Sequence, residues 1–169
     1  MSAPKQKPGR SKQDVQTPRD LLDAVERRFG RIVVDLAATR DNAVVENGCY
    51  YGKGSLFGGT EDSLQVPWAR YAPGLPHELQ WLNPPYANIW PWAAKCAEEG
   101  EMGARIAMLV PASIGSNWFA EHVHDKALVL AISPRVTFVG HTSPYPKDLI
   151  LAVYGPWVAP GFDTWRWRP

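Results

Sequence analysis

The sequence lacks the features that mark exported, metal-binding and membrane proteins. Its 169 residues include only two cysteines, Cys49 and Cys96, with no Cys-x-x-Cys spacing, so we expect reduced thiols rather than disulfides. The four histidines form no zinc-ligand pattern, and we expect no metal. No apolar run approaches the roughly 18 residues of a membrane span, and the N-terminus lacks the apolar core of a signal peptide. We therefore expect a soluble, cytoplasmic protein without a membrane partner.

The chain also has little excess of positive over negative charge. The net charge of +1 does not indicate a nucleic-acid-binding protein. Four basic residues nonetheless fall within residues 1–13, a polar segment that we expect to be a disordered basic tail. Such a tail either contacts phosphates or only keeps the protein soluble. The remaining residues, 14–169, suffice for one domain with a buried core, and we expect a single domain there.

Apolar periodicity predicts strands that alternate with helices. The predicted helices are 18–29, 89–99 and 117–123, and the predicted strands are 32–34, 79–82, 104–111, 127–133, 135–140 and 148–155. We expect Thr17 to cap the first helix, and Gly30 and Gly100 to end the first and second. Residues 41–76 show no long element. The alternation predicts an α/β fold with a mostly parallel sheet flanked by helices.

The stretch Asn83-Pro84-Pro85-Tyr86 follows a predicted strand directly. The sequence [NDS]-P-P-[YFW] in this position marks methyltransferases that act on amino groups of planar systems. Two acceptors, the Asn83 side-chain oxygen and the Pro84 carbonyl, can be directed at the two hydrogens of such an amine, and the prolines fix the carbonyl's direction. Tyr86 can stack on a base rotated out of a duplex. The alternative is a Pro-Pro loop that only ends a strand.

The longer sequence resembles the phage DNA N6-adenine methyltransferase family, which is Dam-like and uses S-adenosylmethionine. The similar pieces, in the family's order and covering about 130 residues, are "QTPRDLLDAVERRFG", "VVDLAATRDNA", "EDSLQVPW", "WLNPPYANIWPW", "VPASIGSNWF" and "PRVTFVG…PYPKDLILAVYG". The resemblance implies a minimal Rossmann-like methyltransferase fold. It also implies site-specific methyl transfer from S-adenosylmethionine to the N6 amine of adenine in DNA.

The resemblance also assigns cofactor-binding residues. Thr17 and Pro18 match the segment against the methionine end of the cofactor, and Asp35 matches the acidic residue that holds the methionine amino group. Asp35 could instead be only a helix N-cap. Asp62 and Leu64 match the segment that meets the cofactor's adenine, for which an exposed loop aspartate is the alternative.

The sequence departs from many methyltransferases after its first predicted strand. The segment "DLAAT" has no glycine, so cofactor binding cannot be argued from a glycine fingerprint. Ala37 in this segment is small enough for backbone to approach a ligand, and we assign it to the cofactor site together with Asn83. Asn42 also fits the family pattern, although a turn-forming asparagine would look the same. Residues 113–115 are less polar than the family leads us to expect.

Three residues are predicted to contact DNA: Arg135, Lys147 and Trp90. Each has a second interpretation. Arg135 is either structural or backbone-binding, and Lys147 either meets a phosphate or forms a loop ion pair with Asp148. Trp90 and Trp92 either extend the base pocket or belong to the core.

Recognition of a DNA sequence must come from loops, because the chain has no room for a separate target-recognition domain. We assign it chiefly to residues 50–68 and 141–147, and we expect a short or relaxed sequence preference. The C-terminal "WRWRP" suits an edge strand packed on the core, or stacking on DNA. Alternatives to the DNA-adenine reaction are methyl transfer to cytosine N4, RNA adenine or glutamine, and a non-catalytic nucleic-acid-binding subunit. The oligomeric state is left open.

Overall fold

The structure is a computed structural model that describes residues 15–45, 50–51, 62–68 and 78–169. The predicted tail, residues 1–13, and most of the predicted recognition loop 50–68 lie outside the described residues, as does Cys49. The elements in chain order are α1 (Arg19–Phe29), β1 (Arg31–Asp35), the 3-10 turn η1 (Ser63–Gln65), β2 (Glu78–Leu82), α2 (Trp90–Glu101), β3 (Ile106–Pro111), α3 (Asn117–His122), β4 (Leu128–Ser133), β5 (Leu149–Tyr154) and β6 (Gly161–Arg166).

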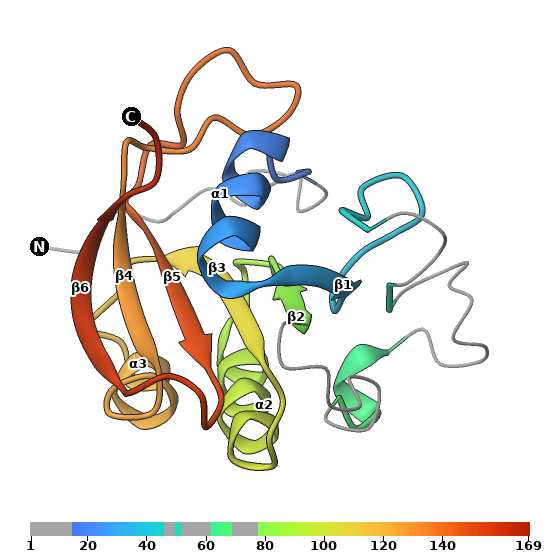
Figure 1. The fold of residues 1–169 in the computed structure, drawn as a ribbon, viewed down its shortest axis with the longest axis vertical. Helices are drawn as coiled ribbons and strands as arrows, with labels where there is room; N and C mark the ends of the chain where they lie inside the picture. The colour runs from blue at the N-terminus through green and yellow to red at the C-terminus, as the bar shows by residue number, and fades with distance from the viewer. Residues whose placement is uncertain (1–14, 46–49, 52–61, 69–77) are drawn as a thin grey trace, which may run out of the picture.

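The six strands form one sheet in the order β1-β2-β3-β5-β4-β6 (Figure 1). The pairs β1–β2, β2–β3 and β4–β6 are parallel, whereas β5 is antiparallel to both of its neighbours. Only β5 is therefore reversed, which confirms the predicted mostly parallel α/β sheet. Parallel strands end at the same edge, so β1 and β2 bring Asp35 and Asn83 to one edge of the sheet.

Helices cover the two faces of this sheet. Alternate residues of the central strands point to opposite sides. Met108 packs with α2 and α3, whereas Leu109 packs with α1. Strands β3 and β5 are buried along their whole length because they lie between these layers. The protein therefore has the three-layer organisation of a Rossmann-like fold.

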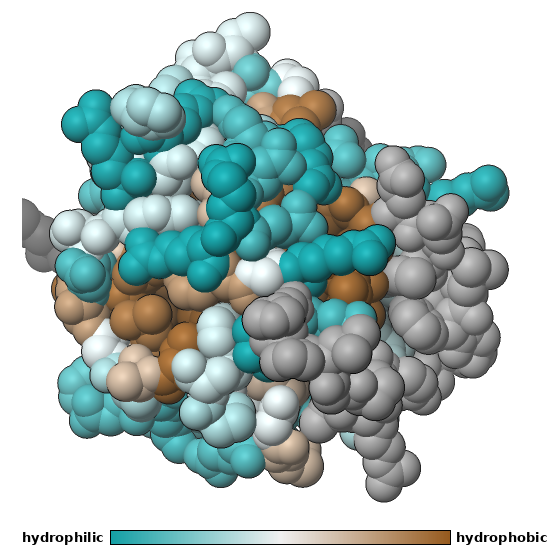
Figure 2. Space-filling model, in the orientation of Figure 1, coloured by the Kyte–Doolittle hydropathy of each residue, from teal (hydrophilic) through white to brown (hydrophobic). Residues whose placement is uncertain are grey.

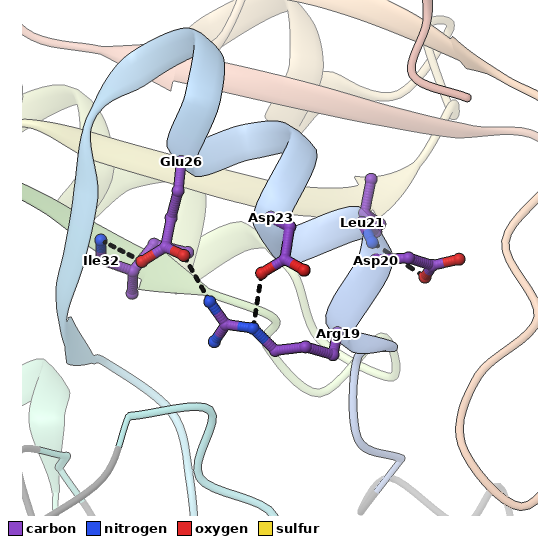
Figure 3. A network of polar contacts seen from close by, with 6 residues as sticks. All are labelled: Arg19, Asp20, Leu21, Asp23, Glu26 and Ile32. Carbon is purple, nitrogen blue, oxygen red and sulfur yellow. Dashed lines mark hydrogen bonds and ion pairs between the residues drawn. The ribbon is translucent and has the colours of Figure 1, made fainter. Parts of the chain in front are cut away.

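A chain of polar contacts joins α1 to the start of β1 (Figure 3). Arg19 Nε donates to Asp23 Oδ1 at 2.7 Å, and the same guanidinium pairs with Glu26. Glu26 Oε1 in turn accepts a hydrogen bond from the backbone nitrogen of Ile32 at 3.0 Å. Gly30 lies between them with φ of 109°, a conformation that favours glycine. These contacts fix the direction of α1 relative to β1.

The C-terminal residues return to α1. Arg168 Nε donates to Asp20 Oδ2 at 2.9 Å, across 148 residues of sequence. Trp167 is 4% exposed and its indole nitrogen donates to Pro134 O, so the interpretation of "WRWRP" as a packed edge segment is confirmed. Strand β6 forms the sheet's edge, and Figure 2 shows apolar surface over this edge and hydrophilic side chains over α1.

Three details of the predicted elements are wrong. The cap of α1 is Pro18 rather than Thr17, whose side chain makes no capping hydrogen bond because it faces a pocket described below. Helix α2 continues through Gly100 to Glu101. Gly100 serves close packing rather than helix termination, because a Cβ there would lie 3.0 Å from the Tyr154 Cβ.

The third error concerns residues 135–140, which form a loop rather than a strand. The alternating apolar pattern arises because Val136 and Phe138 are buried in the α1-side core while their neighbours stay outside. Both edges of β4 are already occupied, by β5 and β6, so this segment has no strand edge to join there. None of the helices in the described part of the chain is long and apolar enough to cross a bilayer.

Candidate active site

A pocket lies at the carboxyl ends of β1 and β2. Its walls are Val15, Thr17, Asp35, Ala37, Asn42, Val44, Trp81 and Asn83. Four of the predicted cofactor-binding residues are therefore neighbours: Thr17, Asp35, Ala37 and Asn83. They come from the segment before α1, from the end of β1 and from the end of β2, as the parallel arrangement of the strands requires.

Asp35 is a buried acid that lacks a cationic partner among the residues described. It is 3% exposed, and its two oxygens accept hydrogen bonds from Ala37 N at 3.3 Å and Val44 N at 3.0 Å. Burial raises its pKa from 3.8 to about 6, although both hydrogen bonds act in the opposite direction. The helix-cap alternative is wrong, because residues 36–45 form turns and bends. A buried carboxylate of this kind is stabilised by a ligand that brings a positive charge.

The Asn83 amide is oriented by the segment that precedes α1. Its Nδ2 donates to Val15 O at 3.3 Å and lies 3.5 Å from Thr17 Oγ1. A backbone carbonyl only accepts hydrogen bonds, so the nitrogen of the amide must face Val15. The carbonyl oxygen Oδ1 is thereby left as the acceptor that the side chain can offer to a substrate.

The asparagine at position 42 both lines the pocket and shapes a turn. Its Oδ1 accepts from Thr39 N at 2.6 Å and from Thr39 Oγ1 at 3.1 Å. The turn-forming interpretation of Asn42 is therefore confirmed, and the turn carries Asn42 and Val44 over the pocket.

Tyr86 belongs to an aromatic cluster. Its ring centroid lies 5.9 Å from that of Tyr145, nearly edge-on, and Tyr145 makes a second such contact with Phe138 at 5.7 Å. The Tyr86 hydroxyl is buried and has no hydrogen-bond partner among the described residues. Burial, with Tyr145 nearby, raises the pKa of Tyr86 far above its usual range, so the hydroxyl stays protonated. The described contacts of Tyr86 are therefore made by its ring and not by its hydroxyl.

Other predicted residues lie elsewhere. Pro18 caps α1 and does not line the pocket. Asp62 is exposed and its carboxylate accepts from Leu64 N at 3.0 Å, which caps η1. Leu64 packs against the α2-side core together with Ala37. Contact of Asp62 and Leu64 with a cofactor stays a prediction.

Two of the predicted DNA-contacting residues occupy a loop at the same edge of the sheet. Arg135 and Lys147 belong to the loop between β4 and β5. Arg135 contacts Asp148 Oδ1 through Nε at 2.9 Å and Nη2 at 2.8 Å, so of the two interpretations of Lys147 the ion pair with Asp148 is wrong. Two nitrogens of the Arg135 guanidinium thus share one carboxylate oxygen. Lys147 is exposed.

The two tryptophans after the Asn-Pro-Pro-Tyr stretch differ in their surroundings. Trp90, the first residue of α2, is 47% exposed and its ring meets the edge of His122. Trp92 stacks on the buried Trp68, with ring centroids 6.5 Å apart. Trp92 thus belongs to the core, whereas Trp90 is available to a partner.

The sequence analysis did not single out Trp81 or Tyr145. Trp81 lies in β2 two residues before Asn83, which directly follows the strand, so the period of two in extended chain places both side chains on one face. That spacing could have identified Trp81. No comparable signal exists for Tyr145, because its contact with Tyr86 joins two loops distant in sequence. No group of three His, Cys, Asp or Glu side chains among the described residues is placed to hold a metal ion.

A mostly parallel α/β sheet with a buried acid at the end of one strand and Asn-Pro-Pro-Tyr at the end of its neighbour defines a class, the Rossmann-like methyltransferases of amino groups. Comparison of the sequence with known families makes this more specific. The family described as DNA N-6-adenine-methyltransferase (Dam) matches residues 5–149, and the chain belongs to that family.

One relative is the DNA N-6-adenine-methyltransferase of Escherichia phage T1. It is 29% identical over 121 residues, which are 72% of this chain and 45% of the relative. The chain thus spans less than half the length of that protein. No solved structure matches the chain significantly.

Proposed function

We propose that this protein transfers a methyl group from S-adenosylmethionine to the exocyclic N6 amine of adenine in DNA. Membership of the Dam family supports the reaction class. The observation that carries the proposal is the orientation of Asn83. Its nitrogen is held by Val15 and Thr17, its oxygen is left to accept, and the same side chain lines the pocket that contains Asp35.

The residues of the pocket fit the methionine end of S-adenosylmethionine. Asp35 offers a buried carboxylate to the ammonium group, and the partner's positive charge would offset the cost of burying the ionised form. Thr17 and Ala37 complete the wall around it. When bound, the cofactor supplies a methyl group activated by its attachment to a positively charged sulfur.

The Asn83-Pro84 pair would act on the amine of the target base. The lone pair of an exocyclic amine is delocalised into the ring, which makes the nitrogen a poor nucleophile. The amine would donate one hydrogen bond to Asn83 Oδ1 and one to Pro84 O. These hydrogen bonds draw the nitrogen toward a pyramidal geometry and stabilise the positive charge that develops on it. Because Val15 and Thr17 hold the Asn83 amide before the base arrives, little reorganisation of this acceptor is needed at the reaction.

Tyr86 would stack on the extruded adenine, while Pro85 fixes the backbone between the acceptor and the ring. We also assign DNA contacts to Arg135, Lys147 and Trp90. Arg135 and Lys147 lie in the loop between β4 and β5, Trp90 begins α2, and all three are at the edge of the sheet that carries Asn83. The two cations would bind phosphates, and the exposed indole would pack against a base or sugar. We assign the reaction to the host cytoplasm, as for a phage-encoded enzyme, because the relative with this sequence pattern is a phage protein.

The test is direct. Purified protein is incubated with S-adenosylmethionine and unmethylated DNA, the DNA is digested to nucleosides, and methylated bases are measured by mass spectrometry. We expect N6-methyladenine with the wild type and with Asn88→Ala, an exposed asparagine in the same loop. We expect none with Asn83→Ala.

Other outcomes would contradict the proposal in distinct ways. N4-methylcytosine in the digest would change the target base. Product from Asn83→Ala at the wild-type rate would remove this residue from catalysis. Absence of any methylated base, with cofactor binding intact in a calorimetric titration, would point to RNA, protein or a missing subunit. Absence of cofactor binding would refute the methyltransferase function itself.

A further inference from the structure

The ring of Tyr86 is carried by a turn rather than by a helix or a strand. The backbone leaves β2 at Leu82 and turns at residues 86–87 before α2 begins at Trp90. A tyrosine side chain on such a turn has several rotamers open to it, and a ring that stacks on a base must be held in one of them. The contacts that restrain this ring therefore bear on its function.

Tyr145 supplies such a contact from the loop between β4 and β5. Its ring centroid lies 5.9 Å from that of Tyr86, and the two ring planes are inclined at 70°. Rings in this geometry attract edge to face rather than by parallel stacking. Tyr145 therefore covers at most one face of the Tyr86 ring, and Tyr86 keeps part of its surface exposed. The geometry is compatible with a base that stacks on Tyr86 while Tyr145 holds it.

Tyr145 is itself anchored to the core. Its backbone nitrogen donates to Val136 O at 2.7 Å, and its ring lies nearly perpendicular to that of Phe138, with the centroids 5.7 Å apart. Val136 is fully buried and Phe138 is 4% exposed, and both pack in the α1-side core. A residue that is fixed both at its backbone and at its ring is suited to restrain a neighbouring ring.

The loop between β4 and β5 also meets the segment that precedes α1. Val139 N donates to Gln16 O at 3.1 Å. Residue 16 lies between the two residues that hold the Asn83 amide. The predicted phosphate contacts, Arg135 and Lys147, belong to the same loop. One loop thus connects the predicted DNA contacts with the supports of the Asn-Pro-Pro-Tyr stretch.

We propose that Tyr145 is a positioning residue for methyl transfer, because it holds the ring of Tyr86 in the orientation that stacks on the extruded adenine. The inference rests on the proposed function, since it assumes that Tyr86 stacks on the target base. Tyr145 acts through Tyr86 and needs no contact of its own with DNA. The described side-chain contacts of Tyr145 are made by its ring, so phenylalanine should replace it.

The experiment measures steady-state methylation of unmethylated DNA, with first DNA and then S-adenosylmethionine as the varied substrate. Tyr145→Ala removes the supporting ring, and Tyr145→Phe keeps it. Val139→Ala is the matched control, since it shortens an exposed side chain of the same loop and leaves the backbone hydrogen bond to Gln16 in place. Tyr145→Ala is also combined with Tyr86→Ala.

We expect Tyr145→Ala to raise KM for DNA by about two- to tenfold, as for the loss of one aromatic pair. Its KM for S-adenosylmethionine should equal that of the wild type, which would also show that the variant keeps its fold. Tyr145→Phe and Val139→Ala should behave as the wild type does. Added to Tyr86→Ala, Tyr145→Ala should have no further effect, because the ring that it holds is gone.

Two kinetic results would overturn the role of Tyr145. One is a wild-type KM for DNA in Tyr145→Ala. The other is a double variant in which the two effects multiply, because Tyr145 would then act independently of Tyr86. Failure of the wild type to methylate DNA would instead refute the proposed function, and with it this role.

A second measurement needs no turnover. In protein with ¹³C-labelled tyrosine rings, the resonance absent from Tyr86→Phe identifies Tyr86. This resonance should be sharp and displaced from that of free tyrosine in the wild type and in Tyr145→Phe. In Tyr145→Ala it should move close to the position of free tyrosine, as for a ring that samples several orientations. A signal equally displaced in Tyr145→Ala would show that other contacts hold Tyr86, and would also overturn the proposal.

Discussion

The pH dependence of the free energy of unfolding should reveal the protonation state of Asp35 in the protein without ligand. Its pKa is raised from 3.8 to about 6, so the folded protein binds a proton that the unfolded chain releases. The raised pKa of this acid stabilises the fold below the unfolded pKa, and the contribution is lost as pH rises through the folded value. We therefore compare the wild type with Asp35→Asn, which cannot ionise, by urea unfolding across this range.

The size of the effect follows from the shift in pKa. A shift of about two units corresponds to about 3 kcal/mol in total. Integration of the linkage relation places about 2 kcal/mol of this between pH 4.5 and 7.5. Relative to Asp35→Asn, the free energy of unfolding of the wild type should fall by that amount over this interval. The comparison cancels the titration of the other groups.

Cofactor affinity should respond in the opposite direction, because the ammonium group requires the ionised carboxylate. With a pKa of about 6, the ionised fraction of Asp35 rises about tenfold between pH 5 and 7. Binding of S-adenosylmethionine by the wild type should strengthen about tenfold over that interval. A difference in unfolding free energy that stays flat with pH would mean that Asp35 is already ionised at pH 4.5, which would refute the reasoning.

Three further predictions concern the ring at the site, the backbone and the DNA contacts. Tyr86→Phe should keep methyl transfer near the wild-type rate, since the buried hydroxyl has no described partner, whereas Tyr86→Ala should raise KM for DNA in steady-state assays. Gly155→Ala should lower the free energy of unfolding by about 2 kcal/mol or more in urea titrations, because φ is 126° and a Cβ would lie 2.6 Å from Ala104 O; an unchanged midpoint would contradict this. Arg135→Ala and Lys147→Ala should each reduce the salt dependence of DNA binding by about one phosphate contact, measured by fluorescence anisotropy across a salt series; unaltered slopes would exclude these contacts.

Much of the site was predictable because it depends on short-range patterns and one topological rule. The apolar runs before Asp35 and Asn83 predict parallel strands, and parallel strands bring their carboxyl ends to one edge. The alternation of helices and strands likewise predicted the two covered faces. These expectations needed only the period of each element and its end.

The features of the site and the fold that the sequence did not predict depend on contacts between segments distant in sequence. Asn83 is oriented by Val15 and Thr17, which lie 68 and 66 residues away in the chain. Periodicity identifies β5 as a strand, but it carries no information on the direction of the strand. That β5 lies between β3 and β4 and runs antiparallel to both was therefore not predicted. From the sequence, Lys147 was a candidate ion-pair partner of its neighbour Asp148, whereas in the folded chain Arg135 forms that ion pair.

The contact between Asp20 and Arg168 has a consequence for how the domain can be rebuilt. It holds the end of the chain beside the first turn of α1, only a few residues after Thr17. Because residue 168 is held at residue 20, a linker from Pro169 to Val15 would close the domain into a ring. The ring could be opened at the Gly103 turn between α2 and β3, which would exchange the order of the two halves in synthesis. In such a permutant β1 and β2 would remain consecutive, so the site would reach the same geometry by a different folding order.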